Sequence, residues 1–486
     1  MEHKVSKEHT SGLSRTLSPI GSISITLSAV TPAASVFVIV PLIITSVGTG
    51  SVTAMALAAI VGIFMAFCWA ELAAKFPVSG GDYALVYHAL KDSSTSLAGA
   101  ASFLTFAMML ASVAFIPAVI ALGTAEYLKV LWQVDPQMAG AVVMVLGTMV
   151  ALLKIQQAAF VTGIFLAVEM VAIVIISFLG FWNWQRNPLE FFTNPVVGIA
   201  DGSLAPVGMG SIFALTAVAV FAYNAFNFPI FFSEETKGRS RGIAKAILVS
   251  LVITVIAEIT PLFAVLVGSP SIEALTTSDK GPLAYFILAT SNTTVNAIVS
   301  IGITLAIFNA VVACIATFGR VMFATGRDKA WPTPISHYLA KINQRTHSPV
   351  VATTLVGVVG AVLCLTVSLD ILIVLTGASL VLNYAMVALA ALVGRANGAT
   401  AQSPYRMPFW PLPPLFAIGA LLYVTAEQTL TALTVTGVTA LIALVYYMVY
   451  LWPRRDEAWR MQLPTPHSGT EDLIGEPSLS PPQLRL

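Results

Sequence analysis

Two glutamates lie inside long apolar runs of the sequence, where an ionisable side chain stands out. Glu169 lies near the middle of the run 158–182, and Glu258 lies in the run 243–268. Desolvation favours the neutral form of a buried carboxyl, and ionisable groups in a membrane interior mark functional sites. If these runs cross a bilayer, we expect Glu169 to bind and release a proton; a permanently protonated carboxyl bonded to a backbone carbonyl is the alternative. Glu258 is a secondary candidate for attracting a cation or relaying protons, with a structural hydrogen bond as its alternative.

Two apolar runs are interrupted near their middles by proline together with small or amide residues. The first interruption is TPAAS at 31–35, and the second is YNAFNFP at 223–229. Proline removes a backbone donor and clashes with the preceding turn. Freed backbone groups at mid-membrane depth are tolerated only beside protein or a water-filled cavity. A simple proline kink is the alternative for either run alone.

Composition assigns these runs to a membrane protein. Hydrophobic residues make up 57% of the 486 residues and charged residues 10%, with a mean hydropathy of +0.86. Soluble domains carry about 25% charged residues, and a membrane-crossing helix needs about 20 mostly apolar residues. The sequence predicts twelve such helices, at about 22–46, 51–75, 97–126, 138–154, 158–182, 207–232, 243–268, 292–325, 349–368, 370–394, 413–429 and 431–452.

The positive residues predict the orientation of these helices. Twelve crossings place both termini on one side, and lysine and arginine favour the cytoplasmic side. All but three of the 24 lysines and arginines then lie on the side of the termini, the exceptions being Lys129, Arg186 and Lys280. We therefore expect a multi-pass protein of the cytoplasmic membrane with both termini in the cytoplasm. Its parts are a tail at 1–20, a twelve-helix body at 21–453, and a tail at 454–486 whose proline, serine and charge predict disorder.

The two interrupted runs are the first and sixth of the twelve. They therefore begin two successive five-helix units of opposite orientation, at about 22–182 and 207–394, with two extra helices at about 413–452. Interruptions at corresponding positions of inverted repeats point to a transport site. The half-helix that starts near Ala33 would direct free N–H groups and a positive dipole end at a carboxylate.

Other classes of protein find no support in the sequence. The net charge of +1 gives no sign of the strongly basic surface that nucleic-acid binding requires. The 3 cysteines and 6 histidines show no metal-ligand spacing, and no nucleophile–base set or phosphate-binding loop is present. We therefore expect no enzyme activity, no metal, no cofactor and no nucleic-acid partner.

Five short motifs resemble those of a known family. They are WAELAAKFPVSGGDY at 69–83, SEETK at 233–237, GRDKAWP at 326–332, SPV at 348–350 and PYRMP at 404–408. In this order and at these positions they resemble the amino acid–polyamine–organocation (APC) superfamily of permeases, across nearly the whole apolar part of the chain. The resemblance implies an all-α membrane protein with the LeuT-type 5+5 inverted repeat, twelve transmembrane helices, and helices 1 and 6 unwound at mid-membrane.

The resemblance also implies a site between helices 1, 3, 6, 8 and 10. Backbone N–H groups from the first break and carbonyls from the second would bind an amino acid. An aromatic residue would gate the site, and an amide would contact the substrate side chain. The residues at these positions are Thr31, Ala33, Ala34, Ser35, Phe221, Ala222, Tyr223 and Asn227. Plain packing is the alternative for the two aromatic residues. Glu169 lies where some proton-coupled members carry a lysine, and Asn309 could line the same place. Asp82, Arg327 and Asp328 would gate the inner side, unless they serve only as an orientation signal.

Some residues depart from the family pattern. The family often has Gly-Ser-Gly at the first break, where this chain has Ala33-Ala34-Ser35 after a Thr-Pro pair that resembles putrescine importers. Asn227 stands where some members carry glutamate, and Lys329 replaces the usual glycine. These departures affect the identity of the substrate rather than the fold.

The function implied is secondary active transport. We expect a permease that moves an amino acid across the membrane by alternating access, with proton symport as the expected coupling. A polyamine or organic-cation importer, favoured by the Thr-Pro pair and Glu258, and an amino-acid exchanger are the alternatives. A sensor that binds a solute but does not transport it is a less favoured alternative. The expected partners are a small amino acid or amine and the lipid bilayer, and the oligomeric state stays open.

Overall fold

A computed structural model of the chain describes residues 17–78, 80–128, 135–153, 155–199, 201–236, 239–346, 348–426, 428, 430–459 and 461. Most of the predicted tails, 1–16 and 462–486, lie outside the described residues, as do Ser79, Lys129 and Lys237. The described part is mostly helical and includes one two-stranded sheet.

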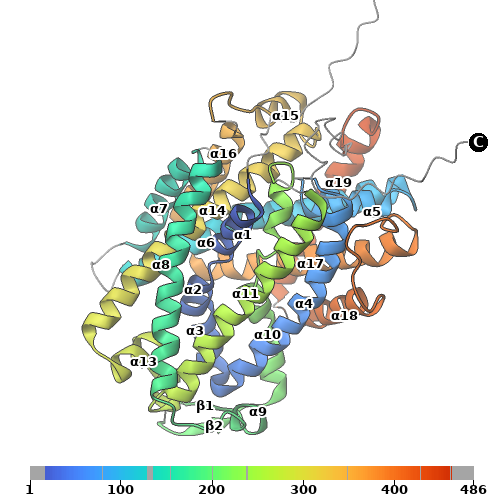
Figure 1. The fold of residues 1–486 in the computed structure, drawn as a ribbon. Helices are drawn as coiled ribbons and strands as arrows, with labels where there is room; N and C mark the ends of the chain where they lie inside the picture. Colours follow the sequence, from blue (N-terminus) through green and yellow to red (C-terminus); the bar gives the residue numbers. More distant parts are fainter. Residues whose placement is uncertain are drawn as a thin grey trace, which may run out of the picture.

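The helices follow one another with short connections (Figure 1). The first half of the chain forms α1 (Pro19–Val30), α2 (Pro32–Ala34), the π-helix η1 (Ser35–Ile39), α3 (Val40–Val47), η2 (Gly48–Gly50), α4 (Ser51–Lys75), α5 (Asp82–Leu90), α6 (Thr95–Leu128), α7 (Pro136–Ala151), α8 (Ile155–Trp182), α9 (Glu190–Thr193), the strands β1 (Val196–Gly198) and β2 (Leu204–Pro206), α10 (Met209–Ala222) and the 3-10 helix η3 (Phe228–Phe232). The second half forms α11 (Arg239–Gly268), α12 (Ile272–Thr277), α13 (Pro282–Thr290), α14 (Thr293–Arg327), α15 (Thr333–Leu339), α16 (Val350–Thr366), α17 (Leu369–Ala396), α18 (Leu412–Ala426), α19 (Leu430–Tyr446), η4 (Tyr447–Leu451) and η5 (Trp452–Arg454).

The helices have the length and surface of a membrane protein. Within the described residues, seven helical stretches are long and apolar enough to cross a bilayer, and α7, α10, α16 and α18 are shorter apolar helices. The first stretch, Ile20–Lys75, covers two of the predicted crossings, and helices occupy all twelve predicted segments. The outer helix α8 exposes Phe160, Val171 and Val174, a surface that suits lipid better than water.

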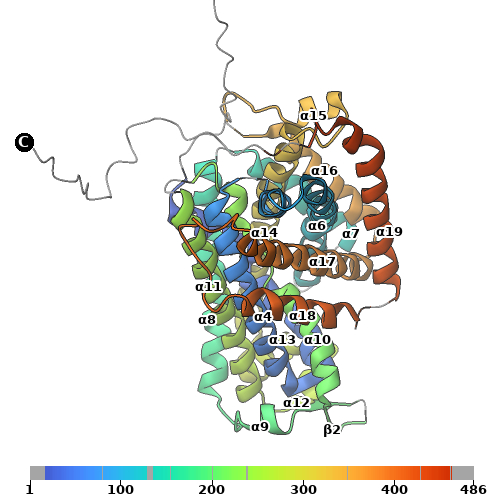
Figure 2. The ribbon, with the colours of Figure 1, turned by 90° about the vertical axis from the view of Figure 1, so that its right-hand side faces the viewer.

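The 35-residue helix α14 is buried along most of its length and packs against α6, α7, α8 and α16. Helix α11 packs against α4 and α8, and α17 packs against α6. Seen from the side, α17 runs across the direction of α8 and α11 (Figure 2). The sheet lies at the lower end of the molecule in Figure 1 and α15 at the upper end; we call these the hairpin end and the α15 end.

The strands were not anticipated from the sequence. They pair antiparallel, with Val197 opposite Ala205. The backbone N–H of Val196 donates to Thr49 Oγ1 at 2.9 Å. This bond ties the hairpin to the corner between α3 and α4.

Both interrupted runs depart from regular helix in the structure. Helix α1 ends at Val30, and Thr31 takes the left-handed conformation with φ 45°. Pro32 then begins α2, at a position where its missing N–H leaves no helix bond unmade. In the second run, α10 ends at Ala222, turns follow, and Ala225 has φ 78° before η3 begins.

The chain continues to pack after the predicted body ends. Residues 454–459 and 461 lie in the predicted C-terminal tail, yet Ala458, Trp459 and Met461 are buried. Their apolar side chains provide the contact surface that composition alone did not reveal.

Candidate functional site

The carboxyl of Glu169 occupies the first helix break. From α8, its Oε1 atom accepts the backbone N–H of Ala33 at 2.8 Å and the Thr31 hydroxyl at 3.0 Å. The Thr31 hydroxyl also lies 3.5 Å from the carbonyl oxygen of Ala306 on α14. A free N–H at the start of a helical segment favours an anion, so the protein's own carboxyl takes the place that the sequence assigned to a substrate carboxylate.

The two breaks touch each other directly. The Ser35 hydroxyl, just after the first break, donates to the carbonyl oxygen of Ala222 at 2.9 Å. Ala222 is the last residue of α10, so its carbonyl is one that a continuous helix would have used. Ala33, Ala34, Ser35, Ala222 and Tyr223 are all buried. The structure therefore brings these predicted binding residues together.

Several buried polar atoms around the breaks are unsatisfied. Among the described residues, Glu169 Oε2, both carboxyl oxygens of Glu258, both side-chain polar atoms of Asn309 and the Tyr223 hydroxyl have no hydrogen-bond partner. Glu258 lies on α11, near Ser35, Glu169 and Tyr223. Buried polar atoms are nearly always paired, so a concentration of unpaired ones marks a place for a proton, water or ligand.

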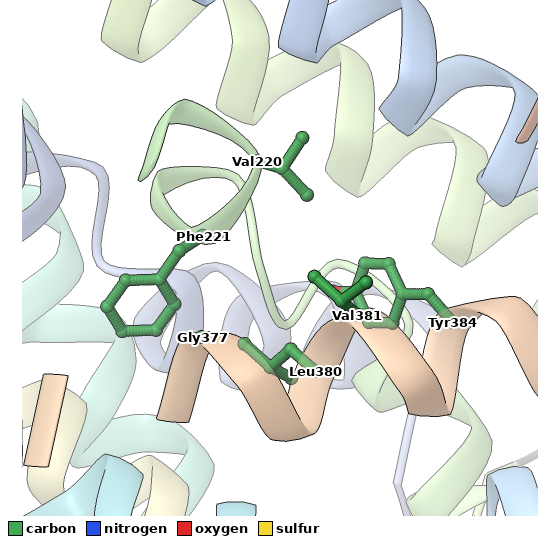
Figure 3. A pocket seen from close by; sticks show the side chains of 6 residues that line it. All are labelled: Val220, Phe221, Gly377, Leu380, Val381 and Tyr384. Carbon is green, nitrogen blue, oxygen red and sulfur yellow. The ribbon is translucent and has the colours of Figure 1, made fainter. Parts of the chain in front are cut away.

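Phe221, the predicted gating aromatic, borders an apolar hollow between α10 and α17. Figure 3 shows Val220 and Phe221 at the end of α10, with α17 passing below them. The hollow is also lined by Gly377, Leu380, Val381 and Tyr384 of α17.

Asn227 lies with the predicted gate rather than with the binding residues. Its amide nitrogen lies 3.4 Å from Asp82 Oδ1. Asp82 also accepts the indole N–H of Trp69 at 2.7 Å and the amide N–H of Asn383 at 2.7 Å. Asp82 is buried, and this burial raises its pKa, which the three hydrogen bonds lower only in part. One carboxyl thus joins α4, α5, the second break and α17; we call it the Asp82 cluster.

A second cluster lies beside it at the α15 end. Arg327 donates to Glu234 at 2.8 Å and to Asp328 at 3.2 Å, and the Tyr83 hydroxyl donates to Asp328 Oδ2 at 2.8 Å. Burial raises the pKa of Asp328, although the Arg327 charge opposes this. We call this group the Arg327 cluster.

Two neighbouring contacts reinforce the Arg327 cluster. Arg320 and Glu235 form a buried two-bond ion pair. The C-terminal segment folds over the cluster: the Trp459 N–H donates to the Asp328 carbonyl at 2.9 Å, its indole N–H donates to Ser102 at 2.8 Å, and its ring stacks on Tyr83 at 5.1 Å.

Sequence reasoning missed part of this arrangement. Asn383 is an amide inside the apolar run 370–394, and a search for polar residues within the apolar runs could have found it. Tyr384 donates to Asn224 within the second break. Trp459 carried no signal, because its neighbours are polar in sequence.

Known proteins resemble this chain over most of its length. A family profile described as amino acid permease matches residues 17–452. A branched-chain amino acid permease of Bacillus subtilis is 24% identical over 83% of this chain and 87% of its own length. A methylthioribose transporter of the same organism is 22% identical over 78% of this chain and 81% of its own. Cationic amino acid transporter 2, vacuolar, of Arabidopsis thaliana is 26% identical over 68% of this chain and 52% of its own.

The described fold, with its seven long apolar stretches, and these matches agree. The chain belongs to the amino acid permease family of the APC superfamily and is a multi-pass membrane transporter.

Proposed function

We propose that the protein carries an amino acid into the cell across the cytoplasmic membrane, in symport with a proton that Glu169 binds and releases. The observation that carries the proposal is the position of Glu169 at the first break, where one carboxyl oxygen accepts two hydrogen bonds and the other has no partner in the described part of the chain.

The proposed coupling arises because the Glu169 carboxylate and the substrate carboxylate compete for the same backbone N–H groups. While ionised, Glu169 holds the Ala33 N–H and repels any other carboxylate there. Protonation removes that charge and weakens the hydrogen bond, since charge-assisted bonds are the stronger ones. The N–H groups at the start of α2 are then free for the carboxylate of the substrate. Substrate binding and protonation of Glu169 therefore favour each other, which is the requirement for symport.

The substrate ammonium has acceptors nearby. The carbonyl of Ala222 ends α10 and lies within one hydrogen bond of Ser35. A bound amino acid would lie between the two breaks, with its carboxylate toward α2 and its ammonium toward the end of α10. Asn309 and Tyr223 offer further polar atoms, which are unpaired among the described residues.

The architecture proposed is the twelve-helix, 5+5 inverted repeat. The interruptions after Val30 and Ala222, at the first helices of the two units, support it. The positive residues support a cytoplasmic position for the α15 end. The Asp82 and Arg327 clusters would then close the cytoplasmic path, and alternating access requires them to separate.

A second candidate is import of an organic cation such as a polyamine. Glu258 favours it, because it is fully buried and both its oxygens are unpaired among the described residues. Amino-acid exchange is a further alternative within the same fold.

The test uses purified protein in liposomes with an imposed pH gradient, alkaline inside, and labelled amino acids outside. The wild type should accumulate an amino acid only with the gradient. Glu169→Gln should lose this dependence, while Glu190→Gln, at an exposed glutamate of α9, should keep it. Uptake of no amino acid, or gradient-driven accumulation by Glu169→Gln, would refute the proposal. Dependence of uptake on a preloaded amino acid would indicate exchange.

A further inference from the structure

The chain returns to the α15 end after its last long helix. In Figure 2, α19 rises to that end, where the Tyr446 hydroxyl donates to the carbonyl of Ala330, just beyond α14, at 3.0 Å. The π-helix η4 and the short helix η5 follow, and turns then lead to Trp459. Residues 452–459, which we call the C-terminal segment, therefore lie against the Arg327 cluster.

Trp459 connects three elements at this end. Its backbone N–H donates to the carbonyl of Asp328 after α14 at 2.9 Å, and its indole N–H donates to Ser102 of α6 at 2.8 Å. Its ring stacks on Tyr83 of α5 at 5.1 Å and meets Phe103 of α6 edge-on, also at 5.1 Å. Because Tyr83 in turn donates to the Asp328 carboxyl, Trp459 holds both partners of that hydrogen bond.

The backbone of Trp459 is strained in this position. Its φ of 56° lies in the left-handed region, which bulky residues rarely adopt. Such strain persists only where the surrounding contacts impose it. The buried indole ring and the two hydrogen bonds supply those contacts. Detachment of Trp459 would therefore relieve strain as well as break contacts.

Two ion pairs would have to separate when the α15 end opens. Arg327 with Glu234 and Arg320 with Glu235 both connect α14 to the residues that follow the second break. The N–H of Leu17 donates to the Glu235 carbonyl at 3.0 Å, so the chain just before α1 is attached to the same residues. Opening would therefore move these residues and α1 together away from α14.

We propose that the C-terminal segment is a latch that holds the α15 end closed and must detach before this end can open. Trp459 is a positioning residue: it fixes Tyr83 on Asp328, and the Asp328 carboxyl in turn orients Arg327 toward Glu234. This inference rests on the proposed alternating access, in which the Arg327 cluster closes the cytoplasmic path. It does not depend on Glu169 or on the identity of the substrate.

Two buried cysteines can report the opening. Cys314 of α14 lies with its Sγ 3.8 Å from the carbonyl oxygen of Ala29 in α1, whereas Cys364 of α16 lies with its Sγ 3.7 Å from the carbonyl oxygen of Ala118 in α6. Movement of α1 away from α14 would uncover Cys314 and leave Cys364 covered. The rate of thiol modification at Cys314, divided by that at Cys364, therefore measures opening separately from general loosening of the fold.

The experiment treats the purified, substrate-free protein in detergent with N-ethylmaleimide and follows each cysteine by mass spectrometry. Trp459→Ala removes a stacked ring and an indole hydrogen bond from the closed state, so the Cys314 to Cys364 ratio should rise by about fivefold or more. Trp459→Phe retains a ring without the indole N–H and should give a ratio between those of wild type and Trp459→Ala. Trp182→Ala, at an exposed tryptophan near the hairpin end, should match the wild type.

Ser102→Ala provides an independent variant, should Trp459→Ala fail to fold. It removes the acceptor of the indole N–H and should also raise the ratio. A wild-type ratio in the variants that fold, or an equal rise in the rates of both cysteines, would overturn the latch. Failure of the wild type to take up any amino acid in liposomes would instead refute the proposed function, because the thiol measurement uses no substrate.

Discussion

Replacing Asp82 by alanine should loosen the α15 end of the protein. In the structure, the Asp82 carboxyl accepts the Trp69 indole N–H and the Asn383 amide N–H, both at 2.7 Å, and a weaker bond from Asn227. Alanine leaves these buried donors without an acceptor. When the end opens, water can reach the donors, so the penalty applies only to the closed state.

The magnitude follows from the two short bonds. At about 1–2 kcal/mol for each buried donor left unpaired, the closed state loses about 2–4 kcal/mol relative to the open state. At 1.4 kcal/mol per factor of ten, the opening equilibrium should shift by roughly 30- to 700-fold.

Hydrogen exchange of the backbone amides reports this equilibrium, because exchange in protected segments proceeds through opening. Peptides covering Asp82–Leu90 and the second break should exchange faster in Asp82→Ala by that factor. Asp201→Ala, at an exposed residue of the loop between β1 and β2, should leave them unchanged. If these peptides exchange in Asp82→Ala at the same rate as in wild type, the Asp82 cluster does not hold this end closed.

Three further predictions concern the same end. Burial raises the pKa of Asp82. The stability that Asp82 gives the closed state is therefore complete below the ordinary aspartate pKa of about 4 and is lost as pH rises through the raised pKa. Hydrogen exchange of Asp82–Leu90, corrected for the intrinsic exchange rate, should show opening that increases with pH in wild type and not in Asp82→Ala. Glu235→Ala leaves the buried Arg320 charge unpaired and should destabilise the protein by about 3–5 kcal/mol, seen as a lower Tm in detergent; an unchanged Tm would contradict this. Trp459→Ala removes the ring stacked on Tyr83 and should lower stability by about 3–5 kcal/mol, with faster exchange of Asp82–Leu90 as the distinguishing signal.

The positions of the helices could be predicted from the sequence because each depends on local properties. An apolar run long enough to cross a bilayer specifies a helix without reference to the rest of the chain. The interruptions at 31–35 and 223–229 were similarly visible, since proline acts on its own helix. The hairpin of β1 and β2 was missed because its strands are three residues each and lie in a connecting segment.

The pairing of side chains across helices was less predictable. Nothing in the sequence indicates that Glu169 contacts Ala33, 136 residues away, or that Asn227 contacts Asp82, 145 residues away. Such contacts depend on how α8 packs against α1 and on where Asn227 of the second break lies relative to Asp82 of α5. The family resemblance assigned Asn227 to the substrate side chain, and in the structure its amide lies beside Asp82.

Proton flux measured during uptake shows directly whether Glu169 couples proton movement to amino-acid movement. Liposomes containing the protein and a trapped pH-sensitive dye receive, outside and with no imposed gradient, an unlabelled amino acid that the protein takes up. If Glu169 is the coupling group, this amino acid should acidify the interior in wild type and in Glu190→Gln, and Glu169→Gln should show no acidification. Entry of the amino acid without acidification in the wild type, or acidification by Glu169→Gln equal to that of the wild type, would show that Glu169 does not couple the two movements.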